Sequence, residues 1–545
     1  MCARAQLGLD APLVQIEAHL GSGLPGFSIV GLPAPVVRES RERVRSAILN
    51  AGFEFPAGRI TINLAPVELA KEGGRYDLPI ALALLIASAQ VRVTRDPLPE
   101  CYGELGLDGE LRPVRGLLLA AVHAARAGRE IIVPAADLHE VRLARALGAH
   151  GFEDLRGVCR FLMGEVGEGV ESPSAPGLNF SEPSGIVSLK NQYTTLDHVK
   201  GQWRAKRALS IAAAGGHSLL LIGPPGSGKT MLAARLIDLL PPLAEHEAME
   251  VAGIASIGPQ GFDPARWGQR PFRSPHHAAS ASAIVGGGAR LRAGEISLAH
   301  HGVLFLDELP EYDRRVLEAL REPLEAGVIT IARASARLEL PAQFQLVAAM
   351  NPCPCGYLGD ERRACRCSAR RVQRYRERIS GPLLDRIDLQ IEVPRVELRA
   401  LCAGGDAPND VDAGVAQAPG QGAAELCARV SAARALQHCR QKTCNARLDH
   451  AGLDTYCRAD PQAQRLLLRV GETLGLSARG YHRLLKVART IADLEGVGQI
   501  SAQHVSEAAS FRPMSADAPL DCGSNAGRIN GRTSGPETPG SQRPA

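Results

Sequence analysis

The stretch "HSLLLIGPPGSGKT", His217–Thr230, joins an apolar strand to a glycine-rich loop, and it decides the fold of the middle of the chain. Its last eight residues match G-x-x-x-x-G-K-[ST], a pattern that binds phosphate where a strand precedes it and a helix follows. There, Lys229 supplies a positive charge to the β- and γ-phosphates, and the hydroxyl of Thr230 reaches Mg²⁺. The residues expected to surround the nucleotide are Gly223, Pro224, Pro225, Gly226, Ser227, Gly228, Lys229 and Thr230. The sequence predicts an ATP–Mg²⁺ site; a glycine-rich turn before an ordinary helix is the alternative.

Two further apolar runs, 302–307 and 344–350, are predicted to be strands of the same parallel sheet. The first ends in Asp307, which can orient the water shell of Mg²⁺, and Glu308 can polarise the attacking water. The alternative is that the two acids merely begin the next helix. The second run ends at Asn351, which can hold the γ-phosphate or the attacking water, although Asn before Pro also opens turns.

Two arginines are candidates for the charge that phosphoryl transfer requires. Arg386 lies in "ISGPLLDRIDLQIEVP", 379–394, where a salt-bridged loop arginine is the simpler alternative. An arginine at the γ-phosphate raises the rate of phosphoryl transfer roughly 10³–10⁵-fold and is often supplied by a neighbouring subunit. We expect Arg386 to act on a neighbour in a ring, with Arg479 in "SARGYHR" as a second arginine sensor.

Polar stretches rich in glycine and proline divide the chain into parts. The fold class expected is multidomain α/β, with a parallel central sheet and helical spacing after residue 424. The expected organisation is an N-terminal domain at 1–163, a linker at 164–186, an ATPase core at 187–397, a loop or hinge at 398–424, a helical lid at 425–512 and a disordered tail at 513–545.

Four cysteines form two C-x-C pairs in "NPCPCGYLGDERRACRCS", 351–368. Cys353, Cys355, Cys365 and Cys367 could ligate a structural Zn²⁺; a reduced loop and a redox-labile disulfide pair are the alternatives. The chain has 13 cysteines and no apolar signal region at its N-terminus, which favours reduced thiols in the cytoplasm. Its longest apolar run, Leu78–Ala87, is ten residues, too short to cross a bilayer.

Basic side chains suggest where a nucleic acid could bind, although the net charge of only +4 does not decide it. Residues 361–380 hold eight arginines and two glutamates, and Arg370, Arg371 and Arg374 are the candidates there for contacts with DNA phosphates. A solvated helix face or a subunit contact is the alternative. Arg333 is expected at the tip of a hairpin over 328–341 and is a further candidate for contact with DNA; a plain hairpin is the alternative. His276 and His277 are interpreted as structural or surface residues without a metal.

In their order along the chain, these motifs resemble those of AAA+ ATPases in the branch shared by magnesium chelatase I subunits and MCM helicases. The motifs that carry this resemblance are the phosphate loop, "DELPE" at 307–311, Asn351, "LLDRID" at 383–388 and "SARG" at 477–480. Together with "RPFRSPHHAASASAIVGGG" at 270–288 and "GEISLAHHGVLFLDELPE" at 294–311, they resemble the ComM/YifB family of magnesium-chelatase-like proteins. The resemblance runs from the N-terminus to about residue 512.

The family implies a homohexameric ATPase that drives branch migration, a helicase activity, while transforming DNA is integrated by homologous recombination in competent cells. Single-stranded or branched DNA and recombination proteins would then be partners, with no membrane involved. Two alternatives remain: a magnesium-chelatase-type motor subunit, and an ATPase that remodels a protein partner.

The N-terminal region resembles the family's Lon-protease-like (S5-type) α+β domain. The resemblance is carried by "GLPGFSIVGLP" at 23–33, "RVRSAILNAGFEFPAGRITINLAP" at 43–66 and "KEGGRYDLPIALAL" at 71–84. Peptide hydrolysis by that fold needs a serine with a lysine as base. Residues 66–84 contain no Ser, Thr or Cys, and no lysine occurs between Lys71 and Lys190. We therefore expect a binding or assembly module and no protease activity.

Overall fold

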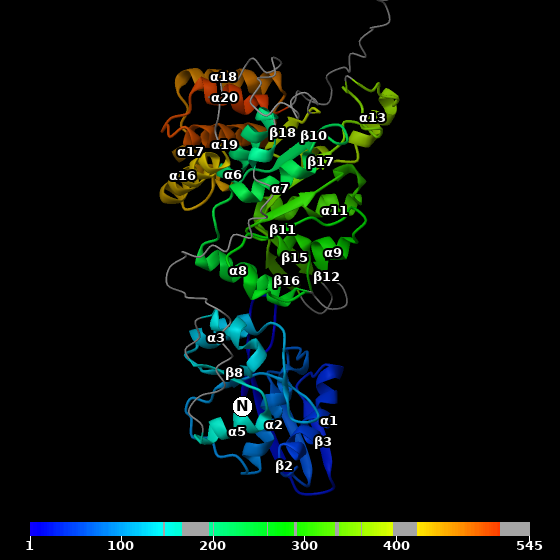
Figure 1. Ribbon diagram of the computed structural model, residues 1–545, viewed down its shortest axis with the longest axis vertical. Helices are drawn as coiled ribbons and strands as arrows, with labels where there is room; N and C mark the ends of the chain where they lie inside the picture. The colour runs from blue at the N-terminus through cyan, green and yellow to red at the C-terminus, as the bar shows by residue number, and fades with distance from the viewer. Residues whose placement is uncertain are drawn as a thin grey trace, which may run out of the picture.

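The computed structural model describes residues 1–144, 148–165, 196–199, 201–258, 260–287, 292–332, 337–360, 362–395 and 422–512. The molecule is elongated, with the N-terminal domain at one end and the nucleotide-binding part and the C-terminal helices together at the other (Figure 1). Among the described helices, none is both long enough and apolar enough to cross a membrane.

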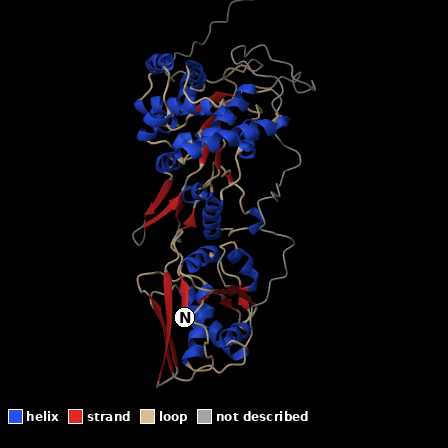
Figure 2. Cartoon of the chain, turned by 90° about the vertical axis from the view of Figure 1, so that its left-hand side faces the viewer, coloured by secondary structure: helices blue, strands red, loops and turns tan. Residues whose placement is uncertain are grey.

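The N-terminal domain is built on a mixed seven-stranded sheet in the order β3-β4-β2-β1-β5-β8-β9. Its strands are β1 Cys2–Arg4, β2 Leu13–Gly21, β3 Gly26–Val30, β4 Arg59–Ala65, β5 Glu100–Cys101, β8 Ile131–Pro134 and β9 Ala149–Phe152, beside a small hairpin of β6 Glu104–Leu105 and β7 Leu111–Arg112. Its helices are α1 Pro35–Asn50, α2 Asp77–Ala87, α3 Leu117–Arg126, α4 Leu138–Arg142 and α5 Leu155–Met163. Figure 2 shows its long strands on one side and its helices on the other. Helix α2 is apolar nearly all round and is therefore buried.

The central part contains a five-stranded sheet in the order β11-β14-β17-β10-β18, and every neighbouring pair is parallel. The strands are β10 Leu219–Ile222, β11 Phe272–Arg273, β14 Val303–Leu306, β17 Gln345–Met350 and β18 Leu389–Glu392. Strands β14 and β17 are buried along their whole length, as expected for a parallel sheet covered on both faces. The three predicted strands are confirmed.

Helices and small hairpins surround this sheet. The helices are α6 Trp203–Gly215, α7 Lys229–Leu239, α8 Glu245–Ile257, α9 Ala281–Val285, α10 Glu295–Leu298, α11 Arg314–Ala319, α12 Arg321–Ala326, α13 Ala369–Arg376 and α14 Gly381–Leu384. Strands β12 Gly286–Gly287 and β13 Arg292–Ala293 form one hairpin, and β15 Val328–Ala332 and β16 Arg337–Pro341 form another. The second is the hairpin predicted over 328–341, but Arg333, predicted at its tip, lies outside the described residues.

The C-terminal part is helical, as predicted, with α16 Ala423–Gln441, α17 His450–Tyr456, α18 Pro461–Thr473, α19 Ala478–Leu494 and α20 Ala502–Ser510. Helix α19 buries Leu484, Val487 and Ile491 on one face and ends just before Gly496, whose φ is +71°. These helices share one hydrophobic core with α6, α7 and one face of the central sheet. The lid is therefore packed directly on the nucleotide-binding part.

The N-terminal domain meets the central part through α3 and α8, which lie next to each other (Figure 1). Leu118 and Leu143 are buried there together with Ala252 of α8. The hydroxyl of Ser256 donates a hydrogen bond to Glu140 at 3.1 Å, which adds a polar contact between the two parts. Helix α8 follows the phosphate-loop helix α7 in the chain, so this junction is one step removed from the nucleotide site.

Candidate nucleotide site

The phosphate loop occupies the carboxyl edge of the central sheet, between the end of β10 and the start of α7 at Lys229. Gly228 has a φ of +89°, a left-handed conformation that favours glycine at the entry to the helix. A side chain at Gly223 would place its Cβ 2.3 Å from the carbonyl oxygen of Val393. The two glycines are therefore required by local geometry, and the strand–loop–helix context that the motif needs is present.

The ammonium group of Lys229 lies inside the loop. It donates hydrogen bonds to the carbonyl oxygens of Gly223 at 2.7 Å and Pro224 at 2.9 Å, and it lies 3.3 Å from Oδ1 of Asn351. Burial lowers the pKa of Lys229, while the carboxylates of Asp307 and Glu308 oppose that shift. The structure thus brings together the lysine and the asparagine, which follow two different strands in the sequence.

Thr230 and Asp307 form the pair of oxygens expected at a magnesium site. The Thr230 hydroxyl donates a hydrogen bond of 2.7 Å to Asp307, although 77 residues separate them in the chain. The contact arises because β10 and β14 end at the same edge of a parallel sheet. Hydroxyl and carboxylate oxygens are the ligands that Mg²⁺ prefers, so these residues fit the ion.

Glu308 has a left-handed backbone conformation, with φ 53° and ψ 47°. For a residue other than glycine this costs about 1–2 kcal/mol, and such strain gathers at functional sites. Its side chain is 52% exposed, and one carboxylate oxygen lies 3.3 Å from Nδ1 of His277. The strained backbone thus leaves a carboxylate at the sheet edge that is open to solvent, which suits a group that polarises water.

His277 and Gln202 belong to the site, and the sequence did not predict this. The histidine loop is held by Tyr312, whose hydroxyl donates a 2.6 Å hydrogen bond to the carbonyl of Pro275. The Gln202 amide donates hydrogen bonds to the carbonyls of Ser227 at 2.7 Å and Pro394 at 3.3 Å, and so joins the loops after β10 and β18. No local pattern marks either residue, because both contacts depend on the fold.

Arg386 lies at the opposite edge of the sheet from the phosphate loop of the same chain. Strands β10 and β18 are parallel, with Leu219 beside Leu389, and Arg386 precedes β18 whereas the phosphate loop follows β10. The Ser218 hydroxyl, just before β10, donates a hydrogen bond of 3.0 Å to the Arg386 carbonyl. The guanidinium of Arg386 therefore cannot reach a phosphate bound by its own chain.

Arg386 and Arg479 converge on one carboxylate, Glu325 of α12, each at 2.8 Å. The side chain of Arg386 is only 6% exposed, so within one chain it is the salt-bridged arginine that the simpler alternative describes. Arg479 is 48% exposed. The roles of both at a neighbour's γ-phosphate stay predictions, and Arg386 would have to leave Glu325 to fulfil its role.

A buried ionic network lies beside Arg386. Asp388 accepts hydrogen bonds from Arg483 at 2.5 Å and from the backbone N–H of Ser218 at 3.1 Å, and it lies 3.3 Å from Nδ1 of His217. Burial alone would raise the pKa of Asp388, but Arg483 and His217 outweigh it and hold that pKa below its ordinary value. The amino edge of the sheet is thus fixed by ionic contacts.

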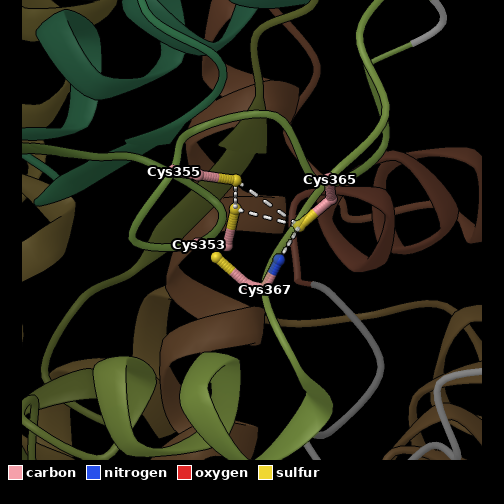
Figure 3. Close-up of side chains that lie close together, drawn as sticks. All are labelled: Cys353, Cys355, Cys365 and Cys367. Carbon is pink, nitrogen blue, oxygen red and sulfur yellow. Dashed lines mark hydrogen bonds between the residues drawn. The ribbon is translucent and has the colours of Figure 1, made fainter.

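The four cysteines converge on one point (Figure 3). The sulfur atoms of Cys353, Cys355 and Cys365 lie 3.3–3.6 Å apart, and all four sulfurs lie within 4.8 Å of one another. The thiols are free, so the predicted disulfide alternative is not what the structure has. Backbone N–H groups, that of Tyr357 first, lower the pKa of Cys355 to about 6. The cluster could bind zinc.

The middle of the arginine-rich run, Ala369–Arg376, forms helix α13, which Figure 1 shows at the margin of the molecule. Val372 and Tyr375 are buried under it, and its exposed arginines are Arg370, Arg371 and Arg374. Just after the helix, Arg378 donates hydrogen bonds to Glu311 at 2.8 Å and to the carbonyl of Pro310 at 3.2 Å. The helix is thereby anchored to the segment that follows Glu308.

These features define a P-loop ATPase with a parallel central sheet. The sequence model of "Magnesium chelatase, subunit ChlI" matches residues 195–401, that of "Subunit ChlI of Mg-chelatase" matches 16–137, and that of "Magnesium chelatase, subunit ChlI C-terminal" matches 420–512. The fold class is therefore an N-terminal ChlI domain with a mixed sheet, an ATPase domain of the chelatase type and a helical C-terminal domain.

Two relatives match along almost their whole length. The protein YifB of Salmonella typhimurium is 49% identical over 510 residues, 93% of this chain and 96% of that protein. Competence protein ComM of Haemophilus influenzae is 46% identical over 513 residues, 94% of this chain and 97% of that protein. DNA replication licensing factor Mcm6 of Drosophila melanogaster matches 62 residues at 39% identity, 11% of this chain and 8% of that protein. The chain belongs to the ComM/YifB family of magnesium-chelatase-like ATPases, as its motifs predicted.

Proposed function

We propose that this ATPase works as a ring of identical subunits, a hexamer, that moves branched DNA during homologous recombination. The observation that carries the DNA part is the anchoring of α13, with its exposed arginines, to the segment after Glu308 through Arg378 and Glu311. DNA phosphates held by these arginines would be linked to the residue that polarises water. The names of two relatives, a competence protein and a replication licensing factor, support the same reading.

The proposal that the subunits form a ring rests on what the two edges of the sheet carry. One edge carries Lys229, Asp307 and Glu308, and the opposite edge carries Arg386 and Arg479. A second copy of the chain would bring its arginines to the γ-phosphate of the first. Single-stranded or branched DNA would then lie in the ring, and recombination proteins would be further partners.

At such a subunit boundary each residue has a distinct task. Lys229 binds the β- and γ-phosphates, and Thr230 and Asp307 hold the Mg²⁺ that neutralises phosphate charge when bound. Glu308, next to His277, takes a proton from the attacking water, and Asn351 orients the γ-phosphate. Arginine from the neighbour stabilises the charge that develops on the transferred group.

For the N-terminal domain we propose a Lon-like fold that serves assembly or partner binding. Its mixed sheet suits that fold, while residues 66–84 offer no nucleophile. Lys71 is buried and donates its hydrogen bond to the backbone carbonyl of Pro66, so its amine is already engaged. The contact between α3 and α8 would couple this domain to the ATPase part.

A steady-state ATPase assay tests the proposal. We would add single-stranded, duplex and four-way-junction DNA, with Lys229→Ala as the blank. We expect several-fold stimulation that is strongest with the junction and falls as salt rises, because phosphate contacts release counterions. Replacing Arg370, Arg371 and Arg374 together by alanine should abolish the stimulation. Arg469→Ala, which removes an exposed arginine of α18, is the matched control and should keep it.

Turnover that no DNA changes would overturn the motor proposal. The alternatives would then be a magnesium-chelatase-type motor subunit, which the name of the family model favours, and an ATPase that remodels a protein partner. In that case the search would turn to proteins that stimulate turnover.

A further inference from the structure

The loop that carries the four cysteines packs against the phosphate loop. At Gly356 an added Cβ would lie 2.6 Å from Cδ of Pro225 and 2.8 Å from its Cγ. Such distances leave no room for a side chain, so the backbone of Gly356 lies directly against the ring of Pro225. Pro225 is one of the residues expected around the phosphates, and the cysteine loop therefore packs against the nucleotide site.

Arg395 adds a second connection between the two loops. It donates a hydrogen bond of 3.2 Å to the carbonyl of Pro225, and its Nε lies 3.6 Å from the carboxylate of Asp360. The ring of Tyr357 lies 5.9 Å from the Arg395 guanidinium and 5.1 Å from that of Arg363. Residues 356–360 thus form a pad that contacts Pro225 directly and through Arg395.

Regular secondary structure does not hold this pad in place. In the described residues between the end of β17 at Met350 and the start of α13 at Ala369 there is no helix or strand. The backbone bonds of the pad are local, such as Gly356 N–H to the Cys353 carbonyl at 2.9 Å. Two cysteines precede the pad and two follow it, so a shared metal ion would tie its two ends together.

We propose that the four thiolates bind one zinc ion and that this ion holds the pad, residues 356–360, against Pro225, so that nucleotide affinity depends on zinc. A tetrahedral site with Zn–S bonds of about 2.3 Å requires sulfurs about 3.8 Å apart. The sulfurs of Cys353, Cys355 and Cys365 lie 3.3–3.6 Å apart, and all four sulfurs lie within 4.8 Å of one another. Thiolates also select zinc over the harder divalent ions. The proposal rests on the nucleotide site alone, because neither zinc content nor nucleotide affinity involves DNA.

The first test uses the full-length protein as purified. We expect one zinc ion per chain by elemental analysis, and replacement by Co²⁺ should produce the visible absorption of a tetrahedral thiolate site. Removing zinc with a chelator should weaken binding of a fluorescent ATP analogue roughly tenfold, about 1.4 kcal/mol, and adding Zn²⁺ back should restore it. Protein without zinc, or nucleotide affinity that is unchanged after its removal, would overturn the proposal.

The second test separates contact with Pro225 from any general effect on the loop. Gly356 and Gly359 have similar left-handed φ values, +84° and +79°, but an added Cβ at Gly359 would meet nothing within 4 Å. We expect Gly356→Ala to weaken nucleotide binding about tenfold more than Gly359→Ala does, because its methyl group would collide with the ring of Pro225. Zinc content should stay at one per chain in both. Equal nucleotide affinities in the two variants would show that the pad does not support the phosphate loop.

The third test removes the ligands. The double variant Cys355→Ser with Cys365→Ser should lose zinc and nucleotide affinity together, whereas Cys439→Ser, at an exposed cysteine outside the cluster, should lose neither. If the double variant fails to fold, the reversible zinc removal above decides the question. A double variant that keeps its zinc would place the ion elsewhere and overturn the assignment.

Discussion

The two edges of the central sheet differ in what their polar side chains contact. At the carboxyl edge, Lys229 and Gln202 bond to loop carbonyls, and Glu308 is 52% exposed with a strained backbone. At the amino edge, Asp388 and Arg483 are bonded to one another in a buried ionic network. The first edge holds its polar groups on loop carbonyls and leaves the carboxylate of Glu308 open to solvent, whereas the second edge engages its polar groups in ion pairs.

This difference suggests how the work is divided within one chain. Open carboxylates and hydroxyls at the carboxyl edge can bind metal and nucleotide, but they stabilise the fold little. The amino edge stabilises the fold and holds the loop of Arg386 at a fixed place for a neighbour. Each chain would then contribute one half of each of two different sites.

The largest effect is expected from Arg386→Ala. Loss of an arginine at the γ-phosphate should lower turnover about 10³-fold or more, while the variant still binds nucleotide because its phosphate loop is intact. The decisive measurement is ATPase activity of a mixture with Lys229→Ala subunits. A mixed ring contains boundaries with one intact phosphate loop and one intact Arg386, so activity should return in the mixture although each variant alone is inactive.

Glu325→Gln is the control for this experiment, because it breaks the ion pair with Arg386 and leaves the arginine in place. If Arg386 serves only that ion pair, Glu325→Gln will resemble Arg386→Ala, and mixing will restore nothing. That result would contradict the proposed division of work between the two edges of the sheet.

The carboxyl edge could be predicted from the sequence because its signals are local. A strand, a glycine-rich loop and a helix follow one another at 217–239, and Asp307 and Asn351 each end an apolar run. Parallel strands then bring these ends together without further information. The zinc-ligand candidates were likewise visible, since two C-x-C pairs lie within 15 residues, 353–367.

The contacts that the sequence did not reveal all join distant parts of the chain. Gln202 meets Pro394 across 192 residues, and Arg386 and Arg479 share Glu325. The contact between Gly356 and the ring of Pro225 also joins residues that lie far apart in the chain. In each case the residue types are common, and only the packing of α6, α12 and the cysteine loop brings them together.

The next effect in size is expected from Asp388→Ala. The substitution leaves Arg483 and His217 buried without their carboxylate, which costs about 3–5 kcal/mol. Hydrogen exchange read by mass spectrometry should show faster exchange of the β10 and β18 amides, which flank the network. Asp385→Ala, three residues earlier and only half-buried, is the matched control and should leave those amides protected.

The effect of Asp388→Ala should depend on pH in a definite direction. Because the pKa of Asp388 lies below its ordinary value, the network contributes its full stability above about pH 4 and loses it as the pH falls further. The difference in exchange between the variant and the native chain should be constant near neutral pH and shrink only in acid. A difference that shrinks already near pH 6 would mean that another group dominates the edge.

The smallest effect is expected from Gln202→Ala at the carboxyl edge. Its amide makes two neutral hydrogen bonds, and the net value of such a bond is about 0.5–1.5 kcal/mol. Nucleotide affinity should therefore fall only about two- to tenfold, as measured by titration with a fluorescent ATP analogue, and β10 and β18 should keep their protection. Gln269→Ala, a glutamine whose amide bonds only to Ala265 nearby in the chain, should leave affinity unchanged. If Gln202→Ala instead exposed β10 and β18 as much as Asp388→Ala, the carboxyl edge would carry as much of the fold as the amino edge, and the contrast between an open edge and a fixed one would be wrong.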